Sequence, residues 1–219
     1  NDELRDALRK GVVANAIYPV MVGSSLRNAG VQLMIDAMCD YLPSPIDVGA
    51  VPGVDPDDAD KKLTREPDPK APASALAFKI MADPFVGTLT FVRVYSGTIK
   101  SGDAIFNAST GKKERVGRLM LMHANKKEEI DEISAGHIAA FLGLKETKTG
   151  NTLCDPAHPI VLEQIDYPEP VIQLSVEPKT KNDQEKMGIG LNKLGSEDPS
   201  FKYYTDPETN QTIIAGMGE

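Results

Sequence analysis

Tryptophan is absent from this 219-residue sequence, and only 5% of its residues are aromatic. Proteins that bind single-stranded nucleic acid without sequence preference usually stack its bases on exposed aromatic side chains. The scarcity of aromatic residues therefore disfavours an independent barrel protein of that kind. Cysteine is scarce as well: Cys39 and Cys154 lie far apart in the chain, so we expect two reduced thiols and no disulfide framework.

Long hydrophobic runs are also missing. No stretch approaches the roughly 18 to 20 apolar residues that cross a bilayer, and the opening NDELRDALRK lacks the basic and then apolar pattern of a secretion signal. We therefore expect a cytoplasmic protein without a membrane partner. The formal net charge of -8 disfavours indiscriminate binding to nucleic acids, and we expect no DNA partner. A local basic patch could still dock on phosphates.

The first part of the chain has a helix, strand and helix pattern. It predicts a short helix over 1–11, an apolar strand over 16–22 and an amphipathic helix over 28–41. The small-residue turn Gly23-Ser24-Ser25 follows the predicted strand, where α/β proteins often bind ligands with backbone N–H groups. Residues 1–42 are too short to form a domain alone. We expect them to be the last part of an α/β domain whose beginning is missing.

Residues 43–73 are rich in proline, aspartate and glycine and lose all periodicity, so we predict a linker. Within this segment Asp55, Asp57 and Glu66 have the spacing of ligands in a helix-loop-helix calcium site. However, alanine and aspartate occupy the loop positions that need an oxygen ligand and a glycine. A solvated acidic segment is the better interpretation.

Short β-rich runs punctuated by turn residues predict a β domain over 74–165. The runs are ALAFKIM, TLTFVRVY, AIFNA, RVGRLMLMH and IAAFLGL. No helical pattern separates them, which indicates a closed antiparallel barrel or a sandwich. Seven glycines between Gly87 and Gly143 supply the turns and corners that such a barrel needs.

Residues 170–219 switch to an α+β pattern. VIQLSVEP predicts a strand, 183–194 a helix, and FKYYT and QTIIAGM two further strands. This order is the first part of a split βαβ, or ferredoxin-like, sandwich, which needs one more helix and strand. We therefore expect a truncated ferredoxin-like domain.

Candidates for catalysis or metal binding are few. Cys154 and His158 have a possible ligand spacing, but a zinc site needs about four ligands, and His123 and His137 lie far along the chain. No serine occurs in a Gly-x-Ser-x-Gly elbow, so hydrolase chemistry has no anchor. We predict neither a catalytic residue nor a metal site.

Basic residues are more suggestive, because several fall on one predicted hairpin and the next turn, where they could neutralise RNA phosphates. These RNA-contact candidates are Lys112, Lys113, Arg115, Arg118, Lys126 and Lys127. The alternative is an ordinary solvated hairpin, since Glu114, Glu128 and Glu129 are interleaved with them.

The order of these segments resembles bacterial elongation factor G, a translational GTPase. The run from DPFVGTLTFVRVYSG to GLKETKTGNTLCDP closely resembles its second domain, and SEDPSFKYYTDPETNQTIIAGMGE resembles the first part of its third domain. The opening residues resemble the end of its GTPase domain. The resemblance implies a multi-domain protein: an α/β remnant of the GTPase domain, then an antiparallel β-barrel, then a partial ferredoxin-like domain.

The resemblance also implies roles for particular residues. Gly23, Ser24, Ser25 and Leu26 fall on the last guanine-nucleotide motif, which meets the guanine carbonyl through backbone N–H groups; the family usually has alanine at Ser25. The phosphate loop, the magnesium ligands and the Asn-Lys-x-Asp element are not in this sequence. GTP or GDP with magnesium is thus implied for the parent protein, while this piece alone is expected to be inactive and without a cofactor. His137 replaces an expected aspartate in a turn of the barrel.

Two interpretations stay open. In the first, the chain is a fragment of elongation factor G, which moves tRNA and mRNA on the ribosome. This fragment would supply the barrel that contacts the ribosome and part of a hinge. Alternatively, it is the matching ribosome-binding module of a sibling translational GTPase, either a ribosomal protection protein or a release factor with the same domain plan.

Overall fold

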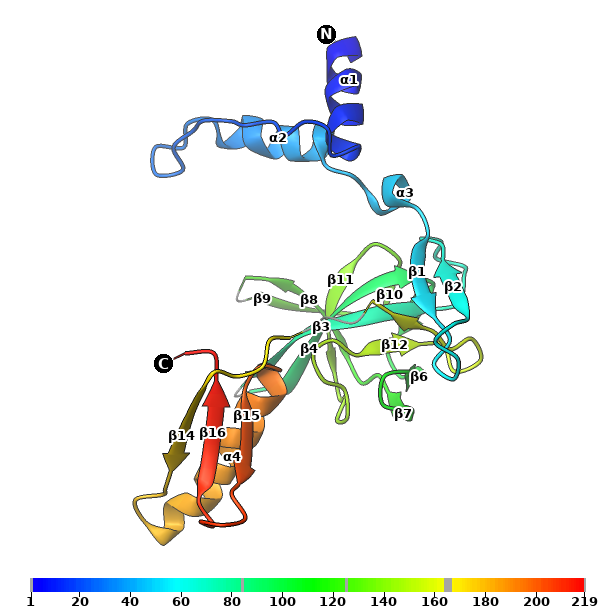
Figure 1. The fold of residues 1–219 in the computed structure, drawn as a ribbon. Helices are drawn as coiled ribbons and strands as arrows, with labels where there is room; N and C mark the ends of the chain where they lie inside the picture. The colour runs from blue at the N-terminus through cyan, green and yellow to red at the C-terminus, as the bar shows by residue number, and fades with distance from the viewer. Residues whose placement is uncertain (1, 84, 125, 164–166, 219) are drawn as a thin grey trace. The chain divides into compact units, whose positions relative to one another are not determined.

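The computed structural model describes residues 2–83, 85–124, 126–163 and 167–218 (Figure 1). The chain divides into two compact units, Asn1–Gly49 and Ala50–Glu219. None of the described helices is long and apolar enough to cross a membrane. The predicted cap residue Asn1 lies outside the described residues.

The first unit contains three helices, α1 (Asp2–Val13), α2 (Val31–Tyr41) and α3 (Pro45–Val48). The helix predicted over 28–41 is confirmed, but it starts three residues later. Gly30 precedes it with a φ of 78°, a left-handed conformation that glycine adopts without steric cost. Arg5 pairs with Asp40 at 3.2 Å, which ties α1 to α2.

The strand predicted over 16–22 does not form. A strand needs a neighbour for its backbone N–H and C=O groups, and none pairs with this segment within the described part of the first unit. The side chains of Val20 and Val22 are 88% and 95% exposed. The segment is therefore apolar, as the sequence shows, but it forms no strand because no neighbouring strand is there to pair with it in the described part of this unit.

The segment 43–73, predicted to be a linker, also differs from the expectation. It contains α3 and two strands, β1 (Val51–Val54) and β2 (Lys62–Arg65). These strands form a sheet with β13 (Val161–Leu162) in the order β13-β1-β2. Their apolar side chains pack with Ile160 and its neighbours in a second hydrophobic cluster of the larger unit.

The predicted barrel is confirmed, and each of the five β-rich runs contains a strand. Its strands are β3 (Ser74–Asp83), β4 (Gly87–Ser96), β5 (Thr98–Lys100), β6 (Ala104–Asn107), β7 (Lys112–Arg115), β8 (Leu119–His123), β9 (Lys126–Ile130), β10 (Glu132–Ser134), β11 (Ile138–Leu142) and β12 (Thr152–Cys154). Eight of them form an antiparallel sheet in the order β7-β6-β12-β3-β4-β11-β8-β9, and β5 pairs with β10.

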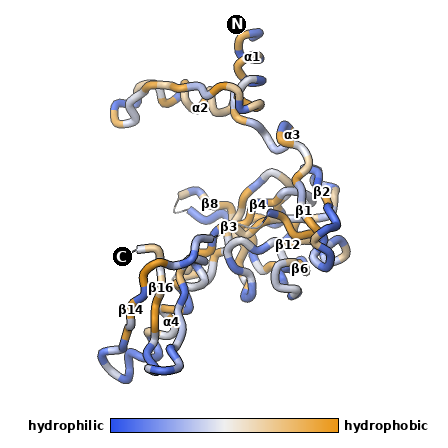
Figure 2. Tube along the Cα trace, in the orientation of Figure 1, coloured by the Kyte–Doolittle hydropathy of each residue, from blue (hydrophilic) through white to orange (hydrophobic). Residues whose placement is uncertain are grey.

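The chain between β7 and β8 joins distant strands of this sheet. Val116 N–H donates to Asp103, beside β6, whereas Gly117 N–H donates to Leu142 on β11 at 2.8 Å. The segment between β7 and β8 is thus hydrogen-bonded first beside β6 and then to β11. This connection closes the barrel. Side chains such as Phe141 and Val92 fill the interior and are fully buried. Figure 2 shows the hydrophobic residues along the barrel strands and the hydrophilic residues at the turns.

The C-terminal part has the predicted α+β order. It consists of β14 (Ile172–Val176), α4 (Lys181–Glu197), β15 (Lys202–Thr205) and β16 (Thr212–Gly216). The three strands form an antiparallel sheet in the order β14-β16-β15. The apolar residues of β14 alternate with polar ones in the sequence, at Ile172, Leu174 and Val176. Burial does not alternate with them, because Ile172 and Leu174 are exposed.

Candidate nucleotide and nucleic-acid sites

The turn predicted to meet a guanine base closes on itself through backbone hydrogen bonds. Ser24 and Ala29 exchange N–H···O bonds of 2.9 Å in both directions, and Asn28 N–H donates to the Ser25 carbonyl at 3.1 Å. Gly23 makes this closure possible, because a Cβ atom there would lie 2.8 Å from the Ala29 carbonyl oxygen. A small, closed loop therefore precedes α2.

The same loop leaves donors free for a ligand. Within the described residues, the backbone N–H groups of Ser25 and Leu26 donate to no acceptor, whereas that of Ser24 is used in the closure. The Leu26 side chain is 95% exposed. Two adjacent N–H groups that have no acceptor can bind a carbonyl oxygen or another acceptor.

The six basic candidates do not form one surface. Lys112, Lys113 and Arg115 lie on β7, while Arg118 precedes β8, and Lys126 and Lys127 begin β9. The β7 and β9 strands are the two ends of the eight-strand order, and Figure 1 shows them on different sides of the barrel. Lys126 and Lys127 thus belong to a strand and not to a turn.

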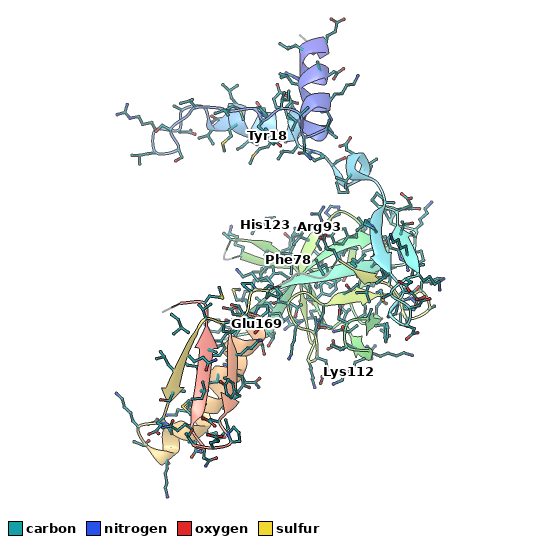
Figure 3. All side chains as sticks on the ribbon, viewed as in Figure 1. Tyr18, Phe78, Arg93, Lys112, His123 and Glu169 are labelled. Atoms are coloured by element: carbon teal, nitrogen blue, oxygen red, sulfur yellow. The ribbon has the colours of Figure 1, made fainter. Side chains whose placement is uncertain are left out.

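The β7 group is divided further by the alternation of the strand. Lys112 lies on the same face as Glu114, and its ammonium binds the Glu146 carboxylate at 2.5 Å. Arg115 is on the other face, and its Nε donates to the Gly102 carbonyl oxygen at 2.8 Å. Figure 3 shows Lys112 on the outside of the barrel.

In the β9 group, a carboxylate holds Lys127. Lys127 binds Asp83, whose carboxylate also accepts the backbone N–H groups of Phe85 and Val86 at 2.9 and 3.0 Å. These interactions, led by the Lys127 hydrogen bond, lower the pKa of Asp83 below its usual value. Lys127 therefore fixes the turn between β3 and β4, and Arg118 approaches Glu129 at 3.8 Å.

Sequence reasoning missed two lysines that the fold brings to Lys112. Lys145 and Lys148 lie in the loop between β11 and β12, on either side of Glu146, the residue that binds Lys112. The sequence around them, GLKETKTG, is typical of a solvated turn. It does not indicate that this turn lies against β7. Only the pairing of β6 with β7 and β12 makes these residues adjacent.

Cys154 and His158 are not combined into a metal site. Cys154 is fully buried on β12, and burial raises the pKa of its thiol. His158 Nδ1 lies 3.0 Å from the Asp155 carboxylate. Over the described ranges, no group of three or more histidine, cysteine or acidic residues could hold a metal ion.

Two protein families match successive parts of the chain. Elongation factor Tu domain 2 matches residues 87–154, which begin at β4 and end at β12. Elongation factor G domain III matches 167–219, the α+β part. The crystal structure of a protein from Thermus thermophilus is similar to the whole chain, with 26% sequence identity and a TM-score of 0.77. The match covers 100% of this chain and 30% of the length of that protein.

These matches define the class of the protein, because two translation elongation factor domains follow one another in this chain. Within that class, the chain joins a barrel similar to elongation factor Tu domain 2 to an α+β part similar to elongation factor G domain III.

Proposed function

We propose that this chain is a segment of elongation factor G, the cytoplasmic GTPase that promotes movement of tRNA and mRNA on the ribosome. The observation that carries the proposal is the order of the two family matches, since the third domain is that of elongation factor G and directly follows the barrel. The sibling translational GTPases remain the alternative.

In this proposal the loop after Gly23 is one wall of the guanine site in the parent protein. The free N–H groups of Ser25 and Leu26 meet the guanine carbonyl oxygen, and Ser24 closes the loop that presents them. Backbone donors tolerate serine in place of the usual alanine, because the side chain is not the binding group. GTP or GDP and its magnesium ion depend on other elements for their phosphate contacts.

The exposed side chains of the first unit support its assignment to a larger domain. Tyr18, Val20 and Leu33 are 76%, 88% and 71% exposed, and Ala37 is the only buried residue among the described helical residues of this unit. Apolar surface of this extent usually marks an interface.

The barrel docks on ribosomal RNA through its basic side chains. We assign this role to the β7 side, because three of the basic candidates, Lys112, Lys113 and Arg115, lie on that strand and only two lie on β9. Lysines on a rigid strand can neutralise phosphates without further ordering, and the affinity should fall as salt is added.

Charge reversal tests this proposal. The double variant Lys112→Glu/Lys113→Glu should weaken binding of the chain to purified bacterial small ribosomal subunits by at least about tenfold, with a smaller salt dependence. The matched control Lys181→Glu/Lys186→Glu makes the same charge change on α4 and should have a much smaller effect. Equal losses in both variants would show that only net charge matters and would contradict docking through β7.

A further inference from the structure

One carboxylate holds a whole loop of the barrel. Glu114 Oε2 accepts the backbone N–H groups of Lys145 and Glu146 at 2.6 and 2.9 Å, and Oε1 accepts the Thr147 hydroxyl. Three consecutive residues of the loop between β11 and β12 are thus bound by a side chain of β7. Hydrogen bonds to an ionised acceptor are stronger than bonds between neutral groups.

A buried amide fixes the same loop from inside. Asn107 on β6 is fully buried, and its Nδ2 donates to Thr147 at 3.3 Å and to Asn151 at 3.1 Å. The Asn151 side chain in turn accepts the Lys148 N–H at 2.8 Å. Both ends of the loop are therefore tied to β6 and β7.

The loop that Glu114 holds also reaches Lys112 and carries two further lysines. Its Glu146 carboxylate binds the Lys112 ammonium at 2.5 Å, and Lys148 follows two residues later. Lys145 adjoins Glu146 in the chain. We name Lys112, Lys145 and Lys148 the lysine platform.

We propose that Glu114 is a positioning residue that holds this loop on β7, so that the lysine platform can contact successive phosphates of an RNA backbone. The inference rests on the proposed docking of the barrel on RNA. Glu114 itself does not touch the RNA, because its carboxylate oxygens are directed to the loop.

For the affinity of a Glu114 variant for RNA, the proposal predicts a change opposite in sign to the one that net charge alone predicts. Replacing an acidic residue in a basic region raises the net charge by one and should, by Coulomb attraction alone, tighten binding to RNA. If Glu114 positions the platform, Glu114→Ala instead weakens binding of the chain to small ribosomal subunits by about fivefold. The slope of log affinity against log salt falls by about two, because two lysines lose their place and each phosphate contact contributes nearly one.

The matched control is Glu146→Ala. It removes the same charge from the loop that Glu114 holds, but the Glu146 side chain accepts no bond from the loop backbone within the described residues, so this variant should bind as tightly as the wild type or more tightly. If Glu114→Ala and Glu146→Ala both tighten binding, Glu114 acts only through its charge and the positioning role is wrong.

Circular dichroism melting would reveal whether Glu114→Ala fails to fold. In that case a variant that keeps the negative charge provides the test. Glu114→Asp keeps the charge but shortens the reach by one methylene group, so it should also weaken binding, while Glu146→Asp should not. Unchanged affinity in Glu114→Asp, with faster amide exchange at Lys145 and Glu146, would overturn the proposal, because the loop would be free and binding intact.

Failure of the proposed RNA docking gives a different result. The triple variant Lys112→Glu/Lys145→Glu/Lys148→Glu should abolish most of the affinity for small ribosomal subunits. If it binds like the wild type, this face is not the RNA surface, and both the docking and the role of Glu114 are contradicted. If it loses affinity while the Glu114 variants do not, only the role of Glu114 is contradicted.

Discussion

Gly117 is the residue at which the barrel changes partner strands. A Cβ atom at this position would lie 2.7 Å from the Leu142 carbonyl oxygen and 3.3 Å from the Leu142 carbonyl carbon. Both obstacles are backbone atoms, so no rotation of a side chain could relieve the contact. The glycine is required here by close approach of two chain segments, since its φ does not lie in the left-handed region.

Gly117→Ala should therefore destabilise the barrel by about 1–3 kcal/mol, because the strand must move away from Leu142. The measurement is urea unfolding followed by the amide NMR signals of β4. The matched control is Gly188→Ala on α4, where an added Cβ meets nothing within 4 Å. That change should stabilise the helix by about 0.5–1 kcal/mol, so equal effects of the two substitutions would contradict the packing argument.

At the scale of elements, the hairpin β1–β2 shows that pairing between strands can outweigh the low strand propensity of individual residues. β1 contains Pro52 and Gly53, both poor strand residues, yet it forms the centre of the β13-β1-β2 sheet. Gly53 fits because a Cβ atom would lie 2.6 Å from the Val161 carbonyl oxygen. The turn is closed by Asp55, which binds Lys61 at 2.7 Å.

Hydrogen exchange should separate this hairpin from a true linker. The amides of Val51, Gly53 and Val54 should exchange slowly, because β1 pairs with β2 and, at its last two residues, with β13. Those in 16–22, which have no strand partner in the described chain, should exchange quickly. Mass spectrometry of peptides from both ranges measures the difference. Equally fast exchange in both would mean that β1 is not stably paired.

At the scale of the whole molecule, the loop proposed to meet guanine lacks the contacts that provide most of the affinity for a nucleotide. The loop offers the N–H groups of Ser25 and Leu26, whereas the phosphates and magnesium need a phosphate loop, and the sequence contains no Gly-x-x-x-x-Gly-Lys-Ser/Thr pattern. One or two hydrogen bonds to a base contribute little affinity.

The 219-residue chain should therefore show no measurable binding of GTP or GDP. Isothermal titration calorimetry with magnesium present is the appropriate measurement, and a buffer without protein serves as the reference. A micromolar dissociation constant corresponds to about 8 kcal/mol of binding free energy, which this loop alone cannot supply. Such a result would contradict the prediction.

Much of the fold was predictable because its signals are local. The run TLTFVRVY became β4, and VIQLSVEP became β14, since alternation and flanking turn residues lie within a few positions of each other. The candidate sites were less predictable. The role proposed for the loop at Gly23 came from a resemblance. The loop that carries Lys145 could not be linked to Lys112, because β11, β12 and β7 lie far apart in the chain.

The sequence by itself determined the order of the five β-rich runs and of the C-terminal strands and helix, because these depend on the short-range preferences of the backbone. Tertiary structure alone decided three other matters: that 16–22 has no strand partner in the described chain, that β1 pairs with the distant strand β13, and that Glu114 binds the loop carrying Lys145. The physical reason is the same in each case. A backbone or carboxylate group is satisfied by whichever partner the fold brings within hydrogen-bonding distance, and sequence spacing does not encode that partner.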